Sequence, residues 1–263
     1  MATVFTVTNQ KGGVGKTTTS INLAAALNRR GIKTLVIDMD PQKGNLTQTL
    51  HGDKNKDTMF EVLCGQTDLP SVIQHTKVCD IAPAKLNLQV LAPTLEKQNS
   101  GIGREHKLRQ ALKKLPADQY DVILVDTAPA LDLLASISLT ASDYVLVVVE
   151  ADVNAMHGMK QLSETVEAIK ECSNPKLDYA GVLMTKFMGR TNNGKDMDVV
   201  AGAIGDEIGA KMFKTHIRHG VSVKDAMTAA SDVYSFDKNN NPAIDYEAFA
   251  DEFIERMGLK KVE

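Results

Sequence analysis

Residues 9–18 read Asn9-Gln10-Lys11-Gly12-Gly13-Val14-Gly15-Lys16-Thr17-Thr18, a glycine-rich stretch with two lysines and two threonines. An aliphatic run, Val4–Thr8, precedes it, and a helical pattern, Thr17–Arg30, follows it. This strand–loop–helix setting is the one that a phosphate-binding loop requires. The glycines permit a tight turn with inward N–H groups, and the helix N-terminus adds the positive end of its dipole. A glycine-rich turn that binds nothing would not need this agreement of residue types, spacing and context.

The residues of this loop have distinct expected roles when the ligand is ATP. Lys16 is expected to reach the β- and γ-phosphates, and the Thr17 hydroxyl is expected to hold Mg²⁺. The common pattern begins with a glycine, but Gln10 stands at that position here, and Lys11 is an additional lysine. The expected nucleotide contacts are Lys11, Gly12, Gly13, Val14, Gly15, Lys16, Thr17 and Thr18.

Short aliphatic runs alternate with amphipathic segments along the rest of the chain. The runs after the first are Lys33–Asp38, Asp121–Asp126, Tyr144–Val149 and Tyr179–Thr185. Near-continuous aliphatic runs are typical of parallel strands that are covered on both faces. Between them, helical rhythms are carried by Leu108, Leu112 and Leu115 and by Met159, Leu162, Val166 and Ile169. The pattern predicts a doubly wound, mostly parallel α/β sheet with helices on both faces, as in P-loop NTPases.

Two aspartates stand where strands of this sheet end. Asp40 lies in the string Asp38-Met39-Asp40-Pro41-Gln42, and Asp126 ends the run Val122–Asp126, which is a Walker B pattern. The carboxyl ends of parallel strands meet at one edge, so both carboxylates should lie near the phosphate loop. Asp40 is expected to orient the attacking water and Asp126 to hold Mg²⁺. Alone, each is equally well explained as an aspartate that caps a turn at the end of a strand.

The composition is that of an ordinary globular protein, with 43% hydrophobic and 24% charged residues. A net charge of −3 excludes a strong overall attraction to polyanions. Three cysteines without a CxxC pair argue against a disulfide framework, a zinc site or a bound cluster. No signal peptide is recognisable, and the longest apolar run, Val145–Val149, is too short to span a bilayer. We expect a cytoplasmic protein whose residues 1–263 form one domain.

The string from Lys11 to Thr17 resembles the deviant Walker A motif of the ParA/MinD family of ATPases. The D-x-D-P-Q string and Asp126-Thr127-Ala128-Pro129-Ala130 are similar to the two switch segments of that family. The resemblance covers nearly the whole chain and is greatest to the short ParA type without an N-terminal helix-turn-helix domain. Two departures are the single proline of the second switch and Thr215–His219, which replaces an Ile-Pro-Arg-Asn string near the adenine.

This resemblance implies roles that the residues alone do not. Asp40 matches the family's aspartate that acts on water, and Lys11 matches a lysine that reaches the partner's nucleotide across a dimer interface. Lys11, Lys16 and Asp40 are therefore the expected catalytic residues, and Thr17 and Asp126 the expected metal ligands. Two chains would then form a homodimer that sandwiches ATP and that hydrolysis takes apart.

The resemblance leads us to expect that the protein binds non-specific DNA at the nucleoid. A ParB-like centromere-binding activator is expected to stimulate its ATP hydrolysis. Arg190 and Arg218 match basic positions that the family uses for DNA. The stretch from Lys186 to Lys224 holds seven lysines and arginines and four acidic residues, in a chain that is acidic overall. An ordinary solvated surface would explain this charge as well.

Three other family roles stay open with less support. A MinD-like regulator would end in a basic amphipathic helix. The last helical segment here, residues 241–257, carries Phe249, Phe253, Ile254 and Met257 on one side, and its charges up to Glu255 are all acidic. We therefore expect it to dock on the core, and we expect no membrane partner. An iron-protein relative would need cluster cysteines near the switch segments, where this chain has none. Positioning of a cargo other than DNA uses the same motifs, and no residue identifies the cargo.

Overall fold

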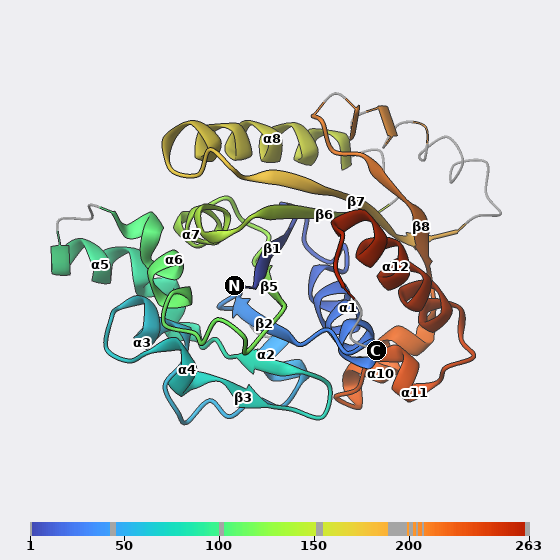
Figure 1. Ribbon diagram of the computed structural model, residues 1–263, viewed down its shortest axis with the longest axis horizontal. Helices are drawn as coiled ribbons and strands as arrows, with labels where there is room; N and C mark the ends of the chain where they lie inside the picture. The colour runs from blue at the N-terminus through green and yellow to red at the C-terminus, as the bar shows by residue number, and fades with distance from the viewer. Residues whose placement is uncertain are drawn as a thin grey trace.

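One mixed sheet forms the centre of the molecule (Figure 1). The computed structural model describes residues 2–42, 46–99, 103–150, 155–188, 199, 202–203, 205–206 and 208–260. The strands within these residues are β1 Thr3–Thr8, β2 Thr34–Met39, β3 Gln74–His75, β4 Asp80–Ala82, β5 Val122–Thr127, β6 Tyr144–Glu150, β7 Asp178–Phe187 and β8 Met212–Arg218. Their order is β3-β4-β2-β5-β1-β6-β7-β8, and every pair is parallel except β3 with β4. The predicted doubly wound, mostly parallel sheet is confirmed.

Helices cover both faces of this sheet. They are α1 Lys16–Arg29, α2 Leu46–Thr49, α3 Met59–Leu63, α4 Leu69–Val72, η1 Leu86–Val90, α5 Leu91–Asn99, η2 Arg104–His106, α6 Lys107–Leu112, α7 Leu133–Ala141, α8 Ala155–Cys172, α10 Val221–Thr228, α11 Val233–Phe236 and α12 Asn241–Met257. Leu124 of β5 packs in the cluster that includes α1 and α12, whereas its neighbours Ile123 and Val125 pack in the cluster that includes α3, α6 and α7. Because successive side chains point to opposite faces, a strand covered on both sides must be aliphatic throughout.

The sequence patterns located the central strands to within about one residue but missed those at the edges. Strands β3 and β4 are only two and three residues long, and β8, at the end of the sheet, buries only Phe213 and Ile217 of its seven residues. Short or half-exposed strands carry no continuous aliphatic run, so they leave little signal. The helical rhythm through Leu108, Leu112 and Leu115 was extended too far, because α6 ends at Leu112. Residues 215–218 of the string that departs from the family's pattern belong to β8.

The last helix is docked on the core, as its sequence predicted. Phe249 and Phe253 on α12 are fully buried, and Phe253 packs against Phe5 of β1 with ring centroids 4.9 Å apart. None of the helices described here combines the length and the apolar character needed to cross a membrane.

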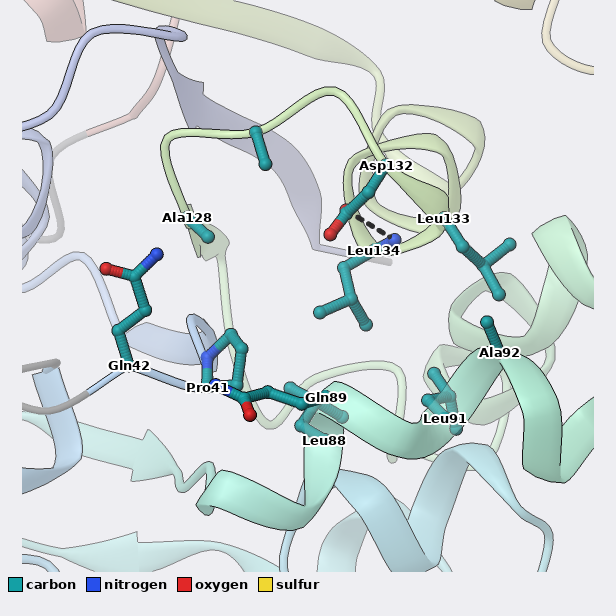
Figure 2. A pocket seen from close by; sticks show the side chains of 11 residues that line it. Pro41, Gln42, Leu88, Gln89, Leu91, Ala92, Ala128, Asp132, Leu133 and Leu134 are labelled. Carbon is teal, nitrogen blue, oxygen red and sulfur yellow. Dashed lines mark hydrogen bonds between the residues drawn. The ribbon is translucent and has the colours of Figure 1, made fainter.

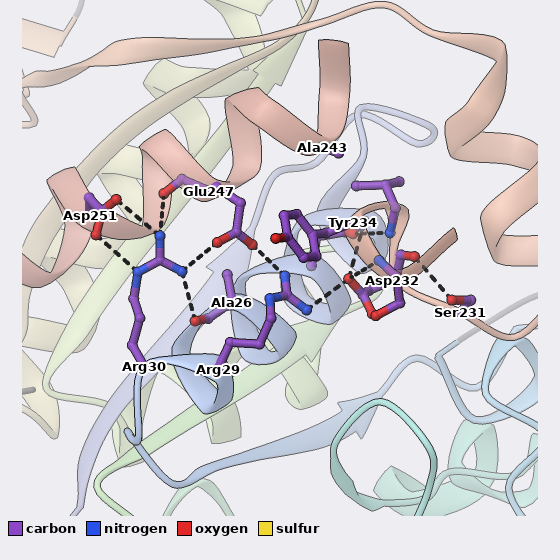
Figure 3. A network of polar contacts seen from close by, with 12 residues as sticks. Ala26, Arg29, Arg30, Ser231, Asp232, Tyr234, Ala243, Glu247 and Asp251 are labelled. Atoms are coloured by element: carbon purple, nitrogen blue, oxygen red, sulfur yellow. Dashed lines mark hydrogen bonds and ion pairs between the residues drawn. The ribbon is translucent and has the colours of Figure 1, made fainter. Parts of the chain in front are cut away.

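An ion-pair network also joins α12 to α1 (Figure 3). The Arg30 guanidinium donates to both carboxylate oxygens of Asp251, at 2.9 and 3.0 Å, and to Glu247 Oε2 at 2.7 Å. Arg29 donates to the other oxygen of Glu247 and, at 3.0 Å, to Asp232 Oδ1. Glu247 is therefore the one carboxylate in the drawn network that serves both arginines.

Replacing Glu247 with glutamine should lower the free energy of unfolding by about 1–2 kcal/mol, because two charge-assisted hydrogen bonds weaken at a partly exposed site. Urea unfolding at neutral pH measures this change. Glu255→Gln is the matched control, since Glu255 is an exposed carboxylate on the same helix. Equal losses in the two variants would show that the network adds nothing to stability.

Candidate functional site

The glycine-rich loop connects β1 to α1 at the carboxyl edge of the sheet. Gly13 and Gly15 have φ values of +76° and +96°, in the left-handed region where other residues are strained. Gly15 is the N-cap of α1, so the first N–H groups of the helix are directed toward the loop. The Thr185 hydroxyl at the end of β7 lies 2.5 Å from the Val14 carbonyl oxygen, which anchors the middle of the loop.

Asn9 holds the beginning of the loop. Its side-chain Nδ2 donates to the carbonyl oxygen of Val148 on β6 at 2.7 Å, and its Oδ1 accepts from the backbone N–H of Lys11 at 3.0 Å. Pro129 lies close to Gly12, because a Cβ placed on Gly12 would lie 3.8 Å from the proline ring. The loop is therefore shaped by three other strand ends, and sequence reasoning assigned no role to Asn9 or Thr185.

Lys16 lies inside this loop with little exposure to solvent. Its Nζ donates to the backbone carbonyl of Lys11 at 3.3 Å. Burial lowers the pKa of the Lys16 ammonium, while the charges of Asp126 and Asp40 act in the opposite direction. A poorly solvated cation enclosed by a glycine-rich loop is suited to binding an anion such as phosphate, which would restore the interactions lost from water.

Asp126 joins the strand β5 to the first turns of α1. Its Oδ2 accepts from the Thr17 hydroxyl at 2.7 Å, and its Oδ1 accepts from the Ser20 hydroxyl at 3.0 Å. Burial raises the pKa of Asp126 to about 6, against the effect of these two hydrogen bonds. Sequence reasoning missed Ser20, although it follows Thr17 by three residues and so shares the same helix face.

The oxygens of Thr17 and Asp126 suit Mg²⁺. This ion prefers hard oxygen ligands and commonly keeps several waters, with one or two protein ligands beside the phosphates of a substrate. Among the described residues there is no group of three or more His, Cys, Asp or Glu side chains that could enclose a metal. The donor set thus fits a metal that arrives with a nucleotide.

Asp38 and Asp40 lie at the end of β2, beside Asp126. Asp38 pairs with Asp126 in the sheet register and accepts from Thr47 Oγ1 at 2.5 Å and from the backbone N–H groups of Thr47 and Asp40. Asp40 is half-buried, accepts from the backbone N–H of Gln42 at 2.8 Å, and has its pKa raised by burial. Asp38 is thus fully buried and holds the turn, whereas Asp40 is only half-buried, so water can reach its carboxylate. This difference favours Asp40 for the chemical role.

Asp38 should make stability depend on pH. Complete burial and the charge of Asp126 raise the pKa of Asp38 to about 7, from an ordinary value near 3.8. Between these values the folded state binds a proton that the unfolded state has lost, so stability falls as pH rises from about 4 to about 7. Asp38→Asn should reduce the slope of the unfolding free energy against pH by up to about 1.4 kcal/mol per pH unit.

Chemical denaturation of the nucleotide-free and magnesium-free protein at pH 5, 6 and 7 measures both slopes. The comparison uses slopes rather than absolute stabilities, because the amide introduced by Asp38→Asn would also weaken the hydrogen bonds from Thr47. Identical slopes for wild type and variant would contradict the prediction.

Lys11 extends toward the end of β6. Its Nζ lies 3.7 Å from Glu150 Oε2, and the Nζ of Lys186 on β7 lies 3.3 Å from the same oxygen. The Lys11 side chain keeps 34% of its surface exposed. The two lysines share one carboxylate at the rim of the loop, and sequence reasoning did not anticipate Glu150.

A hollow of about 290 Å³ separates the segments that follow Asp40 and Asp126. Figure 2 shows Pro41 and Gln42 on one side, Ala128 and Asp132 on another, and η1 and α5 below. Asp132 caps α7 by accepting the N–H groups of Leu134 at 2.9 Å and Ala135 at 3.2 Å. Both expected switch segments therefore border the same small hollow.

Of the two arginines expected to contact DNA, Arg218 lies within the described residues. Arg190 lies outside the described residues. Arg218, at the end of β8, forms a bidentate ion pair with Asp245 of α12, with Nη2–Oδ1 at 2.6 Å and Nε–Oδ2 at 2.9 Å. Its side chain is still 41% exposed. The structure does not bring Arg218 into the loop cluster formed by Lys16, Thr17 and Asp126.

Comparison with known proteins places this site in a family context. A family model described as an AAA domain matches residues 2–179. The sporulation initiation inhibitor protein Soj of Bacillus subtilis is 35% identical, over 96% of this chain and 98% of its own length. The chromosome partitioning protein ParA of Myxococcus xanthus is 31% identical, over 96% and 88%. A cobyrinic acid a,c-diamide synthase from Mycobacterium smegmatis, solved with an ATP analogue and magnesium, superposes with a TM-score of 0.83 at 29% identity, covering 100% of this chain and 98% of that one.

Proposed function

This chain belongs to the ParA-like family of ATPases with an AAA-type domain, and on that premise we propose that it hydrolyses Mg²⁺-ATP at the loop between β1 and α1. One observation carries the proposal. Lys16, the Thr17–Asp126 hydrogen bond at 2.7 Å and the half-buried Asp40 meet at a single edge of the sheet. We treat residues 1–263 as one ATPase domain.

Each residue of the site has a distinct role in the proposed reaction. Lys16 and the N–H groups of the loop from Lys11 to Thr18 bind the phosphates. Thr17 and Asp126 would hold Mg²⁺, which when bound would supply positive charge beside the phosphate oxygens. Asp40 accepts a hydrogen bond from the attacking water and orients it. Asn9, Thr185 and Ser20 keep the loop and Asp126 in place, so the site is preorganised before the nucleotide binds.

We further propose that ATP brings two chains together. In a single chain Lys11 lies 3.7 Å from Glu150, at the rim of the loop and partly exposed. A second nucleotide facing this rim would offer Lys11 a stronger anionic partner than one shared carboxylate. The dimer would then be stable only while the γ-phosphate is present, which makes the nucleotide a switch.

The cargo of this switch is proposed to be DNA, with a ParB-like protein as the activator of hydrolysis. Two relatives bear names of chromosome partitioning or sporulation control, and the basic residues Arg190 and Arg218 match family positions. In this proposal the ATP-bound dimer is associated with the nucleoid, through phosphate contacts that carry no base specificity.

Binding to non-specific duplex DNA tests the proposal. ATP, but not ADP, should produce salt-sensitive binding, and Arg218→Ala should weaken it by about tenfold and reduce the dependence on salt. Arg104→Ala is the matched control, because Arg104 is also a partly exposed arginine in an ion pair, with Glu96 at 2.8 Å. Dimerisation with ATP but no DNA binding at low salt would remove DNA as the cargo and leave a protein or membrane scaffold.

A further inference from the structure

A second cavity opens at the opposite end of the sheet from the phosphate loop. It has a volume of about 660 Å³ and lies where β1 and β5 begin and where the chain enters β6. The loop follows the carboxyl end of β1, so the six residues of that strand separate the two sites by about 20 Å. Nucleotide chemistry in parallel sheets uses the carboxyl edge, and it does not account for this cavity.

The wall of this cavity is largely apolar. Val4 and Ile123 come from the sheet, Leu112 and Leu115 from the end of α6 and the turn after it, and Ala141 from the end of α7. A cavity of this size is within the range of small-molecule sites, which are lined mainly by apolar groups with a few polar ones. The volume and the lining suit an alkyl or aryl chain.

Cations dominate the charged groups that line the cavity. These groups are Arg109, Lys113, Lys176 and Asp143. Arg109 is held in place by donating to the carbonyl oxygens of Ser173, at 3.2 Å, and of Thr140. Asp143 accepts the backbone N–H of Val4 at 2.8 Å, so its carboxylate is engaged in closing the sheet. Three cations around one engaged carboxylate favour an anionic head group.

We propose that this cavity binds a small amphipathic carboxylate. The apolar chain would lie against Val4, Ile123 and Leu115, and the carboxylate would lie among Arg109, Lys113 and Lys176. This site shares no residue with the phosphate loop, so the proposal does not depend on the proposed ATPase function.

Calorimetric titration of the full chain with dodecanoate tests the proposal. Saturating Mg²⁺-ADP is included so that the phosphate loop is not available to the carboxylate. Dodecanoate should bind at one site and about tenfold more tightly than dodecyltrimethylammonium, which has the same chain and the opposite charge. Acetate, which has the charge without the chain, should not bind measurably.

Variants then locate the site. Lys113→Glu with Lys176→Glu should weaken dodecanoate binding by about tenfold, and both lysines are exposed, so the fold should tolerate the change. Ala117→Trp, at an exposed position of the lining, should block binding by filling the cavity. Lys238→Glu is the control, since it reverses an exposed lysine that does not line the cavity.

Three results would overturn the proposal. They are an absence of dodecanoate binding, equal affinity for the two chain-matched probes, and binding unaffected by Ala117→Trp in a variant with an unchanged circular dichroism spectrum. The last result would place dodecanoate elsewhere on the protein.

Discussion

Lys16→Ala should slow ATP hydrolysis by about 10²–10³-fold, the usual cost of removing one preorganised charge from a site that stabilises a developing negative charge. Lys16 is buried, and its ammonium is enclosed by the loop and flanked by Asp126 and Asp40. No neighbouring cation is placed to replace it within the described part of the loop, because the Lys11 side chain is directed toward Glu150. Phosphate release at saturating Mg²⁺-ATP measures the rate.

Two controls make this result interpretable. Lys33→Ala removes an exposed lysine just before β2, at the other end of the sheet, and should leave the rate unchanged. Thermal unfolding of Lys16→Ala shows whether the variant still folds, since the substitution also removes a counter-charge from buried Asp126. A folded Lys16→Ala protein that hydrolyses ATP at the wild-type rate would refute the proposed active site.

Lys11→Ala should abolish ATP-dependent dimerisation while one chain still binds the nucleotide. Within a single chain the contact of the Lys11 ammonium with Glu150, at 3.7 Å, is partly exposed, so its loss costs little in solvent. Across a dimer, however, the same ammonium would meet the phosphates of the facing nucleotide, where water is excluded. The effect on hydrolysis should follow the loss of the dimer.

Light scattering of ATP complexes measures the dimer. An Asp40→Ala background slows turnover, so ATP persists during the measurement, and the effect of Lys11→Ala is measured both in this background and in the otherwise wild-type chain. Lys186→Ala is the matched control, because Lys186 contacts the same Glu150 oxygen at 3.3 Å but lies on β7, outside the loop. A Lys11→Ala protein that dimerises with ATP as the wild type does would show that the lysine does not bridge the subunits.

Sequence reasoning identified the residues whose side-chain type and position in a motif together indicate their chemical role. Lys16, Thr17, Asp40 and Asp126 were named because lysine, hydroxyl and carboxylate groups follow strands in patterns tied to phosphates and metals. It passed over Asn9, Ser20, Thr185 and Glu150. These four have common polar side chains, and each acquires a role only through its partner in the fold. Asn9 donates to a carbonyl on β6, and Ser20 donates to the Asp126 carboxylate on β5. Thr185 donates to the loop backbone, and Glu150 contacts two lysines.

What the sequence determined by itself was the local character of each segment. Glycines at positions 13 and 15, the aliphatic runs of β1, β5 and β6 and the amphipathic α8 each follow from neighbours in the chain, through backbone freedom and burial. Only the tertiary structure decided which segments are adjacent. The order β2-β5-β1 brings Asp126 to Thr17 across 109 residues and beside Asp38, and the docking of α12 brings Asp245 to Arg218. Such contacts depend on the packing of the whole sheet, because strand order is a long-range property that no local pattern encodes.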